Sequence, residues 1–480
     1  GSNGGEAESS SNTEKRLWRP GRLGQVCVFF MRTLKSRLSN HQYVFINLVE
    51  PVVLALLAAF ITHGARGGEY VFMENGSLAT YFFISVVVAL FLGLSVSAEE
   101  INRDRSILQR ESFLHLSWPC YIMAKSLYLM LVTAIQMALY VSFGNGVLEI
   151  PDMFPTMFLV LFSCGAVSCV LGLNISAALK SAVAIYILIP VLLVPQIMLG
   201  GAVVPLEDLI HRQAGNRYTP LAADCMPSRW GLEALIVKQY VSNRYMRNFF
   251  EDDCSIKQCD YMLSFHLPEM SALAAYPFLE TDVPDKPSQI ARKLTTLGNE
   301  IRLLEQSTGL SSGIQADVFT PSGFTPEVER LARGYLETVA EKYRAALKAS
   351  LKQKQETEDA LRSRLGRKGL SALKEAHYNE SIADIALRTK VLDAIRLSGG
   401  RLVQTAAPIC QTPESNWGKA HFPAARKRIG SWLIPAHVFN VVVLWAMTAL
   451  LYLALYFSVL PAILSSAESA ANRLRRRKRP

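Results

Sequence analysis

The chain has 480 residues, of which 50% are hydrophobic and 19% are charged, and its formal net charge is +10. This apolar content exceeds what a soluble core needs, so the composition favours a membrane protein. The lysines and arginines stand beside apolar segments, which is typical of membrane flanks rather than of a nucleic-acid-binding surface. We therefore expect membrane lipids, and no nucleic acid, among its partners.

The first 40 residues divide into a linker and an amphipathic segment. Residues 1–20 begin GSNGGEAESSSN, which is typical of a flexible linker or a tag remnant, and we expect a further domain upstream. Within residues 21–40, Arg32, Lys35 and Arg37 alternate with apolar side chains at near-helical spacing. These are Val28, Phe29, Met31, Leu34 and Leu38. The pattern predicts a connecting helix in the membrane interface, with an ordinary surface helix as the alternative.

Six apolar stretches are long enough to cross a bilayer, whose hydrocarbon core needs about 20 helical residues. They are approximately His41–Thr62, Thr80–Ser97, Trp118–Phe143, Phe154–Leu179, Ala182–Val204 and Ile429–Leu460. We therefore expect spans one to five within residues 41–204 and span six within residues 429–464. A basic tail follows at residues 465–480.

The basic residues of the short loops indicate the orientation. They occur in the N-terminal flank, in the charged loop after span two, at Lys180 and in the tail, and six spans place all four groups on one side. Lysine and arginine in short loops favour the cytoplasmic side. We predict a multi-pass protein of the inner membrane with both termini cytoplasmic and the long loop extracytoplasmic.

That long loop precedes span six and contains no spanning segment. We predict a re-entrant outer region at residues 205–248 and an extracytoplasmic helical domain at residues 249–428. In the latter, Thr325 and Pro326 are typical of a helix start, and a second helical pattern from about Leu370 to Leu397 stops at Gly399-Gly400. The fold class predicted is an all-α membrane protein with six transmembrane helices, an N-terminal interfacial helix, re-entrant outer helices and this large helical insertion.

The eight cysteines separate by side. Four of them, Cys225, Cys254, Cys259 and Cys410, lie in the predicted outer loop, where an oxidising compartment favours two disulfides with three possible pairings. The first choice is Cys254 with Cys259, which leaves Cys225 with Cys410. The spacing does not resemble a zinc site, so we expect no metal.

Two charged residues fall inside predicted spans. Glu50 lies in span one, where a carboxylate is a functional candidate by default, and we favour an ion pair with a basic group near the cytoplasmic edge. For Lys125 in span three we expect the ammonium group to extend to the interface.

The sequence gives little sign of chemistry. A phosphate-binding G-x-x-x-x-G-K-[ST] loop and an H-E-x-x-H helix are both absent. We therefore expect no catalytic residues and no cofactor bound by this chain.

Three segments resemble those of a known family. SAEEINRDRSILQRES is a charged loop between spans two and three, Leu171–Leu209 carries Pro195-Gln196 and Gly200-Gly201, and PSRWGLEAL covers Pro227–Leu235. With the order of the elements, these resemble the membrane half of ABC exporters, in particular the G-subfamily-like, type V architecture of the ABC type-2 permeases. The resemblance covers about half of the chain and leaves the insertion from about Phe249 to Ala425 without a counterpart.

The resemblance implies the permease half of an ATP-driven exporter that works as a homodimer. ATP and Mg²⁺ would be bound by a nucleotide-binding ATPase domain, fused upstream or separate. Spans two and five would line the path of a hydrophobic or lipid-like cargo that moves outward. The lining residues expected are Phe83, Val87, Leu90, Leu192, Gln196 and Leu199.

The same resemblance makes the charged loop the coupling segment to the ATPase. Its charged residues are Glu99, Glu100, Arg103, Asp104, Arg105, Arg110 and Glu111. Ile101, Asp104, Arg105 and Leu108 fall at helical spacing, which predicts a short amphipathic helix along the membrane surface. A solvated connecting turn is the alternative. At the level of function, the alternatives are a mechanotransmitter that acts on extracytoplasmic partners without transport, and a receptor with no link to ATP.

Overall fold

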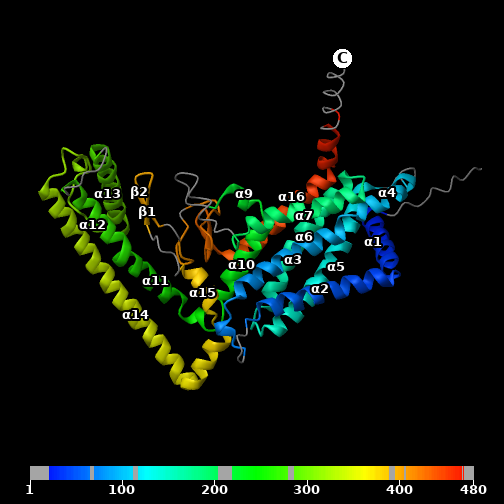
Figure 1. Cartoon of the computed structure of the whole chain (residues 1–480), viewed down its shortest axis with the longest axis horizontal. Helices are drawn as coiled ribbons and strands as arrows, with labels where there is room; N and C mark the ends of the chain where they lie inside the picture. The colour runs from blue at the N-terminus through cyan, green and yellow to red at the C-terminus, as the bar shows by residue number, and fades with distance from the viewer. Residues whose placement is uncertain are drawn as a thin grey trace, which may run out of the picture.

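The computed structural model describes residues 21–64, 70–111, 117–203, 219–278, 286–388, 395–404, 407–413, 415–466 and 469. The expected linker and most of the basic tail lie outside these residues. Figure 1 shows a bundle of long helices and, beside it, a helical arm that extends away from one end of the bundle at an angle.

The bundle is built from seven helices of the described part of the chain. They are α1 (Arg22–Leu38), α2 (His41–Thr62), α3 (Leu78–Ser97), α5 (Trp118–Val147), α6 (Phe154–Ala178), α7 (Ala182–Met198) and α16 (Ala436–Tyr456). Among the described helices, five are long and apolar enough to cross a membrane. The other two, α1 and α7, have 17 residues each and span only about 25 Å at 1.5 Å per residue.

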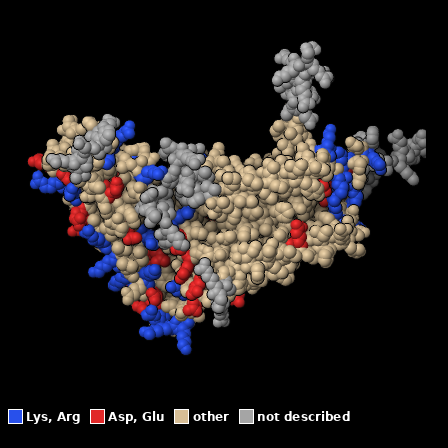
Figure 2. Space-filling view, viewed as in Figure 1, with Lys and Arg blue, Asp and Glu red and all other residues tan. Residues whose placement is uncertain are grey.

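A shorter helix, α4 (Glu100–Glu111), follows α3 directly and takes the place of the predicted amphipathic segment. Its Ile101 shares a core with Leu34 of α1, Tyr121 of α5 and Leu455 of α16. We call this end of the bundle, at α1 and α4, the proximal end, and the opposite end the distal end. Figure 2 shows charged side chains at the proximal end and few along the bundle on the face drawn.

Small residues allow α3 and α6 to approach closely. A Cβ atom at Gly93 of α3 would lie 2.5 Å from the carbonyl oxygen of Gly165 on α6, and one at Gly172 would meet the hydroxyl of Ser97. Association of helices in a bilayer depends on such packing, because lipid is as apolar as the side chains. These glycines therefore hold the two helices together.

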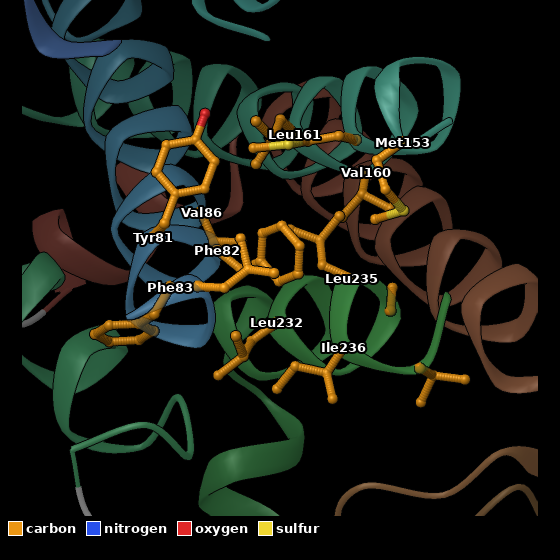
Figure 3. Packing of buried hydrophobic residues seen from close by; sticks show 14 of the residues in the cluster. Tyr81, Phe82, Phe83, Val86, Met153, Val160, Leu161, Leu232, Leu235 and Ile236 are labelled. Carbon is orange, nitrogen blue, oxygen red and sulfur yellow. The ribbon is translucent and has the colours of Figure 1, made fainter. Parts of the chain in front are cut away.

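The distal side begins with α9 (Leu221–Asp224) and α10 (Pro227–Val241), which packs against α3, α6 and α16. In Figure 3, Leu232 and Leu235 of α10 lie among Phe82 and Val86 of α3 and Leu161 of α6. The segment PSRWGLEAL is thus buried beside the spans.

The arm follows α10. Its helices are α11 (Phe250–Tyr261), α12 (Leu267–Ala275), α13 (Lys286–Thr308), α14 (Pro326–His377) and α15 (Glu380–Leu387), with a π-helical turn, η4 (Met262–His266), between α11 and α12. Short 3₁₀ turns accompany the arm at η3 (Met246–Asn248), η5 (Tyr276–Phe278) and η6 (Ala316–Val318), and another, η1 (Phe72–Glu74), lies between α2 and α3. One core, which includes Leu297 and Val339, belongs to the arm alone, whereas Phe250 and Ile382 at its base share a core with the bundle. The predicted boundary at residue 249 stays a prediction.

The start of α14 was predicted correctly. Thr325 caps the helix by accepting the N–H of Val328, and Pro326 occupies the first turn. The helix breaks at Gly366, whose φ of 72° favours glycine.

The chain is mostly helical, as predicted, but it is not all-α, because the described part also contains two antiparallel hairpins. They pair β1 (Ile395–Ser398) with β2 (Arg401–Gln404) and β3 (Arg426–Ile429) with β4 (Trp432–Pro435). Gly399 and Gly400 have φ values of 58° and 71°, which suits a tight hairpin turn rather than the predicted helix end. The predicted helical pattern is therefore confirmed where α14 and α15 cover it, up to Leu387, and was wrong at Ile395–Leu397, which belong to β1. The β3–β4 hairpin also moves the start of the last span from Ile429 to Ala436.

The disulfide prediction needs correction too. Cys254 on α11 is bonded to Cys410, while Cys225 and Cys259 are free thiols. Cys254 and Cys259 lie five residues apart on one helix, so their side chains are about 140° apart around its axis at 3.6 residues per turn and cannot meet. The bond that forms joins α11 to the loop before β3.

Candidate functional site

The proximal end contains a cluster of ion pairs centred on Glu100. This carboxylate is 2% exposed, and it pairs with Arg37 of α1, with Arg103 Nη2 at 2.5 Å and with Lys125 Nζ of α5 at 3.0 Å. Removal of this buried carboxylate would leave its cationic partners uncompensated. Glu100 therefore joins α4 to both α1 and α5.

Asp104, one helical turn after Glu100, extends this cluster. Its carboxylate lies 2.7 Å from Lys125 Nζ and accepts the hydroxyl of Tyr121 at 3.0 Å. Lys125 is 4% exposed, so the expectation that its ammonium group extends to the interface was wrong. The two carboxylates of α4 hold the charge within the protein instead, which the spacing along α5 could not reveal.

Helices α4 and α6 cap each other. Ser176 Oγ near the end of α6 accepts the N–H groups of Ile101 and Asn102, both at 3.0 Å. In return, Arg105 Nη2 donates to the carbonyls of Ala177 at 3.1 Å and Leu179 at 3.4 Å. The orphan donors of one helix start and the orphan acceptors of one helix end are thus satisfied together. A displacement of α4 would act directly on α6.

The opposite face of α4, which we call its free face, is exposed within the described part of the chain, although Arg103 on it also pairs with Glu100. Arg103, Ile107 and Arg110 are exposed and spaced by four and three residues, so they lie on one face of the helix. Ile107 is 45% exposed, although it lies between two arginines. The predicted coupling residues therefore divide: Glu100, Asp104 and Arg105 face the bundle, and Arg103 and Arg110 face outward.

The other two predicted coupling residues, Glu99 and Glu111, are not assigned to either face. Glu99 is half-buried. The side chain of Glu111 lies outside what the structure describes.

For Glu50 the expected ion pair is absent from the described residues. This half-buried carboxylate lies in α2, and the sequence places only one lysine or arginine, Lys125, within the six long helices α2, α3, α5, α6, α7 and α16. Because Lys125 is held at the proximal end by α4, no cation is left for Glu50 within those helices.

The predicted lining residues lie along the contact between α3 and α7. Phe83 and Leu90 of α3 are buried, and Val87 is half-buried. On α7, Leu192, Gln196 and Leu199 are also half-buried, and Gln196 Oε1 accepts the N–H of Ser228 of α10 at 3.2 Å. In a single copy of the chain these residues form packing contacts rather than an open path.

A second charged cluster, which the sequence did not reveal, lies at the distal end. Glu233 of α10 and Lys427 of β3 are both 0% exposed, and Lys427 Nζ lies 2.6 Å from Glu233 Oε2. Asn440 of α16 donates to the same oxygen at 2.9 Å. Burial lowers the pKa of Lys427 to about 8 despite the neighbouring carboxylate. Burial alone would raise the pKa of Glu233, but Lys427 and Arg229 outweigh it and hold that pKa below its usual value.

Arg229 completes this cluster. Its guanidinium group pairs with Asp224 at 2.6 Å and lies 4.3 Å from the ring centre of Trp230, and Lys427 Nζ lies equally close to that ring. Arg229 and Lys427 thus both lie near the ring of Trp230, and each of them pairs with a carboxylate, Asp224 for Arg229 and Glu233 for Lys427. This cluster fixes α10, β3 and the first turns of α16 to one another.

The fold and the proximal site define a multi-pass membrane protein with a short charged helix fixed across the ends of its spans. Residues 24–240 match the model of a family described as ABC-2 type transporter. The match covers slightly less than half of the chain and is consistent with an ABC-2 permease family. No curated protein matches the chain. The matched residues include α4 and almost all of α10, and the arm lies beyond them.

Proposed function

We propose that this chain is the permease half of an ATP-driven exporter of the G-subfamily-like, type V class, and that the exposed face of α4 receives the ATPase domain. The observation that carries the proposal is the two-sided character of α4. Its buried side is fixed to α1, α5 and α6 by ion pairs and caps, and its free side presents Ile107 between two arginines.

The connections of α4 suit the transmission of a movement. A push on its free face reaches α5 through Lys125 and α6 through Arg105 without any flexible linker between them. The ATPase domain, with its ATP and Mg²⁺, supplies the energy. Helix α1 is joined to Glu100 by the ion pair of Arg37. Movement of a domain placed upstream would therefore reach α4 through α1.

The proposed topology has six spans, with α7 as the short one. Helix α7 begins beside the proximal end of α6 and reaches Ser228 of α10 through Gln196 at its distal end, so it runs the length of the bundle. Both the start of α2 and the end of α16 then lie at the proximal end. The basic residues of α1 and α4 support a cytoplasmic location for that end, and the disulfide at Cys254 supports an extracytoplasmic, oxidising location for the arm.

We place a second copy of the chain against α7. Several large apolar side chains of this helix are exposed, with Val183 at 68% and Ile187 at 65%. In a homodimer, the contact between α3 and α7 would lie near the shared axis. Its apolar character favours a hydrophobic or lipid-like cargo that moves outward across the inner membrane.

The test measures ATP hydrolysis by the purified complex of this chain with its ATPase domain in nanodiscs. The variant I107E/R110E changes the free face of α4, and we expect it to assemble in the membrane but to lose most of the hydrolysis that depends on the permease. The matched control is L365E/R367E, because Leu365 on the arm is 48% exposed, close to the 45% of Ile107. Equal hydrolysis by both variants would refute the proposal.

One observation favours a mechanotransmitter as the second candidate. The base of the arm is bonded to loops at the distal ends of the spans: Asn379 Nδ2 donates to the carbonyls of Phe72 at 2.8 Å and Asn75 at 3.0 Å, and Ser381 donates to Gly76 at 2.9 Å. Movement of α2 and α3 would therefore reach the arm. Stimulation of the ATPase by extracytoplasmic proteins, with no transported molecule in vesicle assays, would favour this candidate over the exporter.

A further inference from the structure

The β3–β4 hairpin and the segment bridged to it carry an exposed apolar patch of three side chains, Trp417, Ile429 and Trp432. They are 88%, 49% and 74% exposed. Ile429 pairs directly with Trp432, and Trp417 forms an antiparallel bridge to Ile429. Residues paired across antiparallel strands place their side chains on the same face. The three side chains therefore form one row across three neighbouring segments.

The position of Lys427 shows which way this face points. Lys427 lies two residues before Ile429 on β3, so both side chains leave the same face of the strand. Lys427 is fully buried against Glu233 of α10 and near the ring of Trp230. The face that carries the apolar row is thus the one that covers the membrane-associated helices. Near Lys427 this face of the hairpin packs on the protein, and at Ile429 it extends beyond the helices that it covers.

The start of α16 fixes the height of the patch relative to the bilayer. The helix begins at Ala436, directly after β4, and its 21 residues span about 31 Å, which matches a hydrocarbon core of about 30 Å. Gly418, next to Trp417, lies over the ring of Phe439 in the first turn of α16, where a Cβ atom would come within 2.5 Å of that ring. Trp417 therefore lies at the level where the span leaves the hydrocarbon.

The apolar surface continues from the hairpin onto α16. Val438 and Val442 are 46% and 61% exposed on the first turns of the helix, where a spanning helix meets lipid. Arg426 and Arg428 alternate with Lys427 and Ile429 along β3 and so lie on its other face. Leu433 of β4 pairs with Arg428 and is 43% exposed, so this other face combines cationic and apolar side chains. Such a mixture suits a hairpin that lies between lipid and water.

We propose that Trp417, Ile429 and Trp432 insert into the boundary between headgroups and acyl chains of the distal leaflet and anchor the start of α16 there. Tryptophan favours this boundary, because its ring is largely apolar while its N–H needs a polar partner. An exposed apolar patch of this kind marks an interaction site, and its continuity with the lipid-facing surface of α16 identifies the bilayer as the partner. The inference depends on α16 crossing the membrane and not on the proposed coupling to ATP.

The test uses tryptophan fluorescence of the full chain in phosphatidylcholine–phosphatidylglycerol vesicles. The lipids carry bromine, which quenches tryptophan, either near the headgroup or near the end of the acyl chain. We expect the variant W417F/W432F to lose a large part of the quenching by the shallow bromine and none of the quenching by the deep bromine. The matched control W445F changes a residue of α16 that is 37% exposed and should lose deep quenching only.

Two outcomes would overturn the proposal. If the fluorescence lost in W417F/W432F was quenched by aqueous iodide and not by lipid, the hairpin stands in water. If it was quenched by neither, the patch is covered by protein, with a second copy of the chain as the first candidate. Phenylalanine keeps an aromatic and apolar side chain, so both variants should fold.

Discussion

Lys125 of α5 lies between two carboxylates of α4, with its Nζ 3.0 Å from Glu100 Oε2 and 2.7 Å from Asp104 Oδ2. This relationship makes α4 part of the bundle rather than a loop on its surface. A charge pair taken out of water strongly resists the loss of one partner, because the other is then left uncompensated. The stability of the proximal end and the proposed transmission of movement therefore depend on the same side chains.

The variant E100Q tests this dependence. It leaves Arg37 and Lys125 without their shared carboxylate, and we expect the free energy of unfolding to fall by about 3 to 5 kcal/mol. The control R103A removes a partner that is 45% exposed, for which about 1 kcal/mol or less is expected. Thermal unfolding in detergent measures the stability of both variants. Equal midpoints for E100Q and R103A would contradict the central role of Glu100 in the ion-pair cluster. Reversal of Glu100 and Asp104 to lysine is accordingly a poor test of coupling, since the fold itself depends on them.

Loss of the disulfide should destabilise the base of the arm. The bond joins Cys254 to Cys410, 156 residues apart, and the chain-entropy model gives about 4 to 5 kcal/mol for a loop of this length. We expect C410S to unfold at a lower temperature, and C225S, which changes an exposed free thiol, to behave as the wild type. Peptide mapping without reductant should recover the Cys254–Cys410 pair, and recovery of a Cys254–Cys259 pair would show that our assignment is wrong.

Acid should weaken the distal cluster through His421. Burial lowers the pKa of this imidazole to about 4, against an ordinary 6.5, while the nearby Glu233 carboxylate opposes the shift and Lys427 and Arg388 add to it. Between these two pH values the unfolded chain binds a proton that the folded chain does not, so the free energy of unfolding falls as pH drops from about 6.5 to 4. The lowered pKa of Glu233 acts in the same direction below its ordinary 4.5.

The variant H421Q isolates the contribution of the imidazole. Glutamine keeps a donor for the carbonyl of Pro408, which His421 Nε2 contacts at 3.0 Å, and it does not titrate. Melting temperatures measured at neutral pH and near pH 5 should differ less for H421Q than for the wild type. An unchanged pH dependence would assign the acid sensitivity to other groups.

Sequence patterns predicted the elements whose signal is local. The α4 helix follows from the spacing of Ile101, Asp104 and Leu108, and the start of α14 follows from Thr325 and Pro326. Pairings over long distances could not be predicted in this way. Lys427 and Glu233 lie 194 residues apart in the sequence, and nothing local to either indicates the other. The same holds for Lys125, whose partners lie on a different helix.

Two errors come from ambiguous local signals. Gly399-Gly400 is compatible with a helix end and with a hairpin turn, and only the pairing of Ile395 with Gln404 separates them. The short distance from Cys254 to Cys259 along the sequence favoured a local disulfide, although a helix separates the two side chains. Both depend on the secondary structure around them, which the residues themselves do not specify.

The most direct test of the proposed function is a cross-link between α4 and the ATPase domain. In the complex purified with its native ATPase domain, Cys27 and Cys225, the exposed free thiols of the described chain, are replaced by serine, and a single cysteine is introduced as I107C or, for comparison, as L365C. A short bifunctional thiol reagent should join position 107 to the ATPase domain and leave position 365 unlinked. Absence of a link at position 107, or equal linkage at both positions, would contradict the assignment of α4 as the coupling helix.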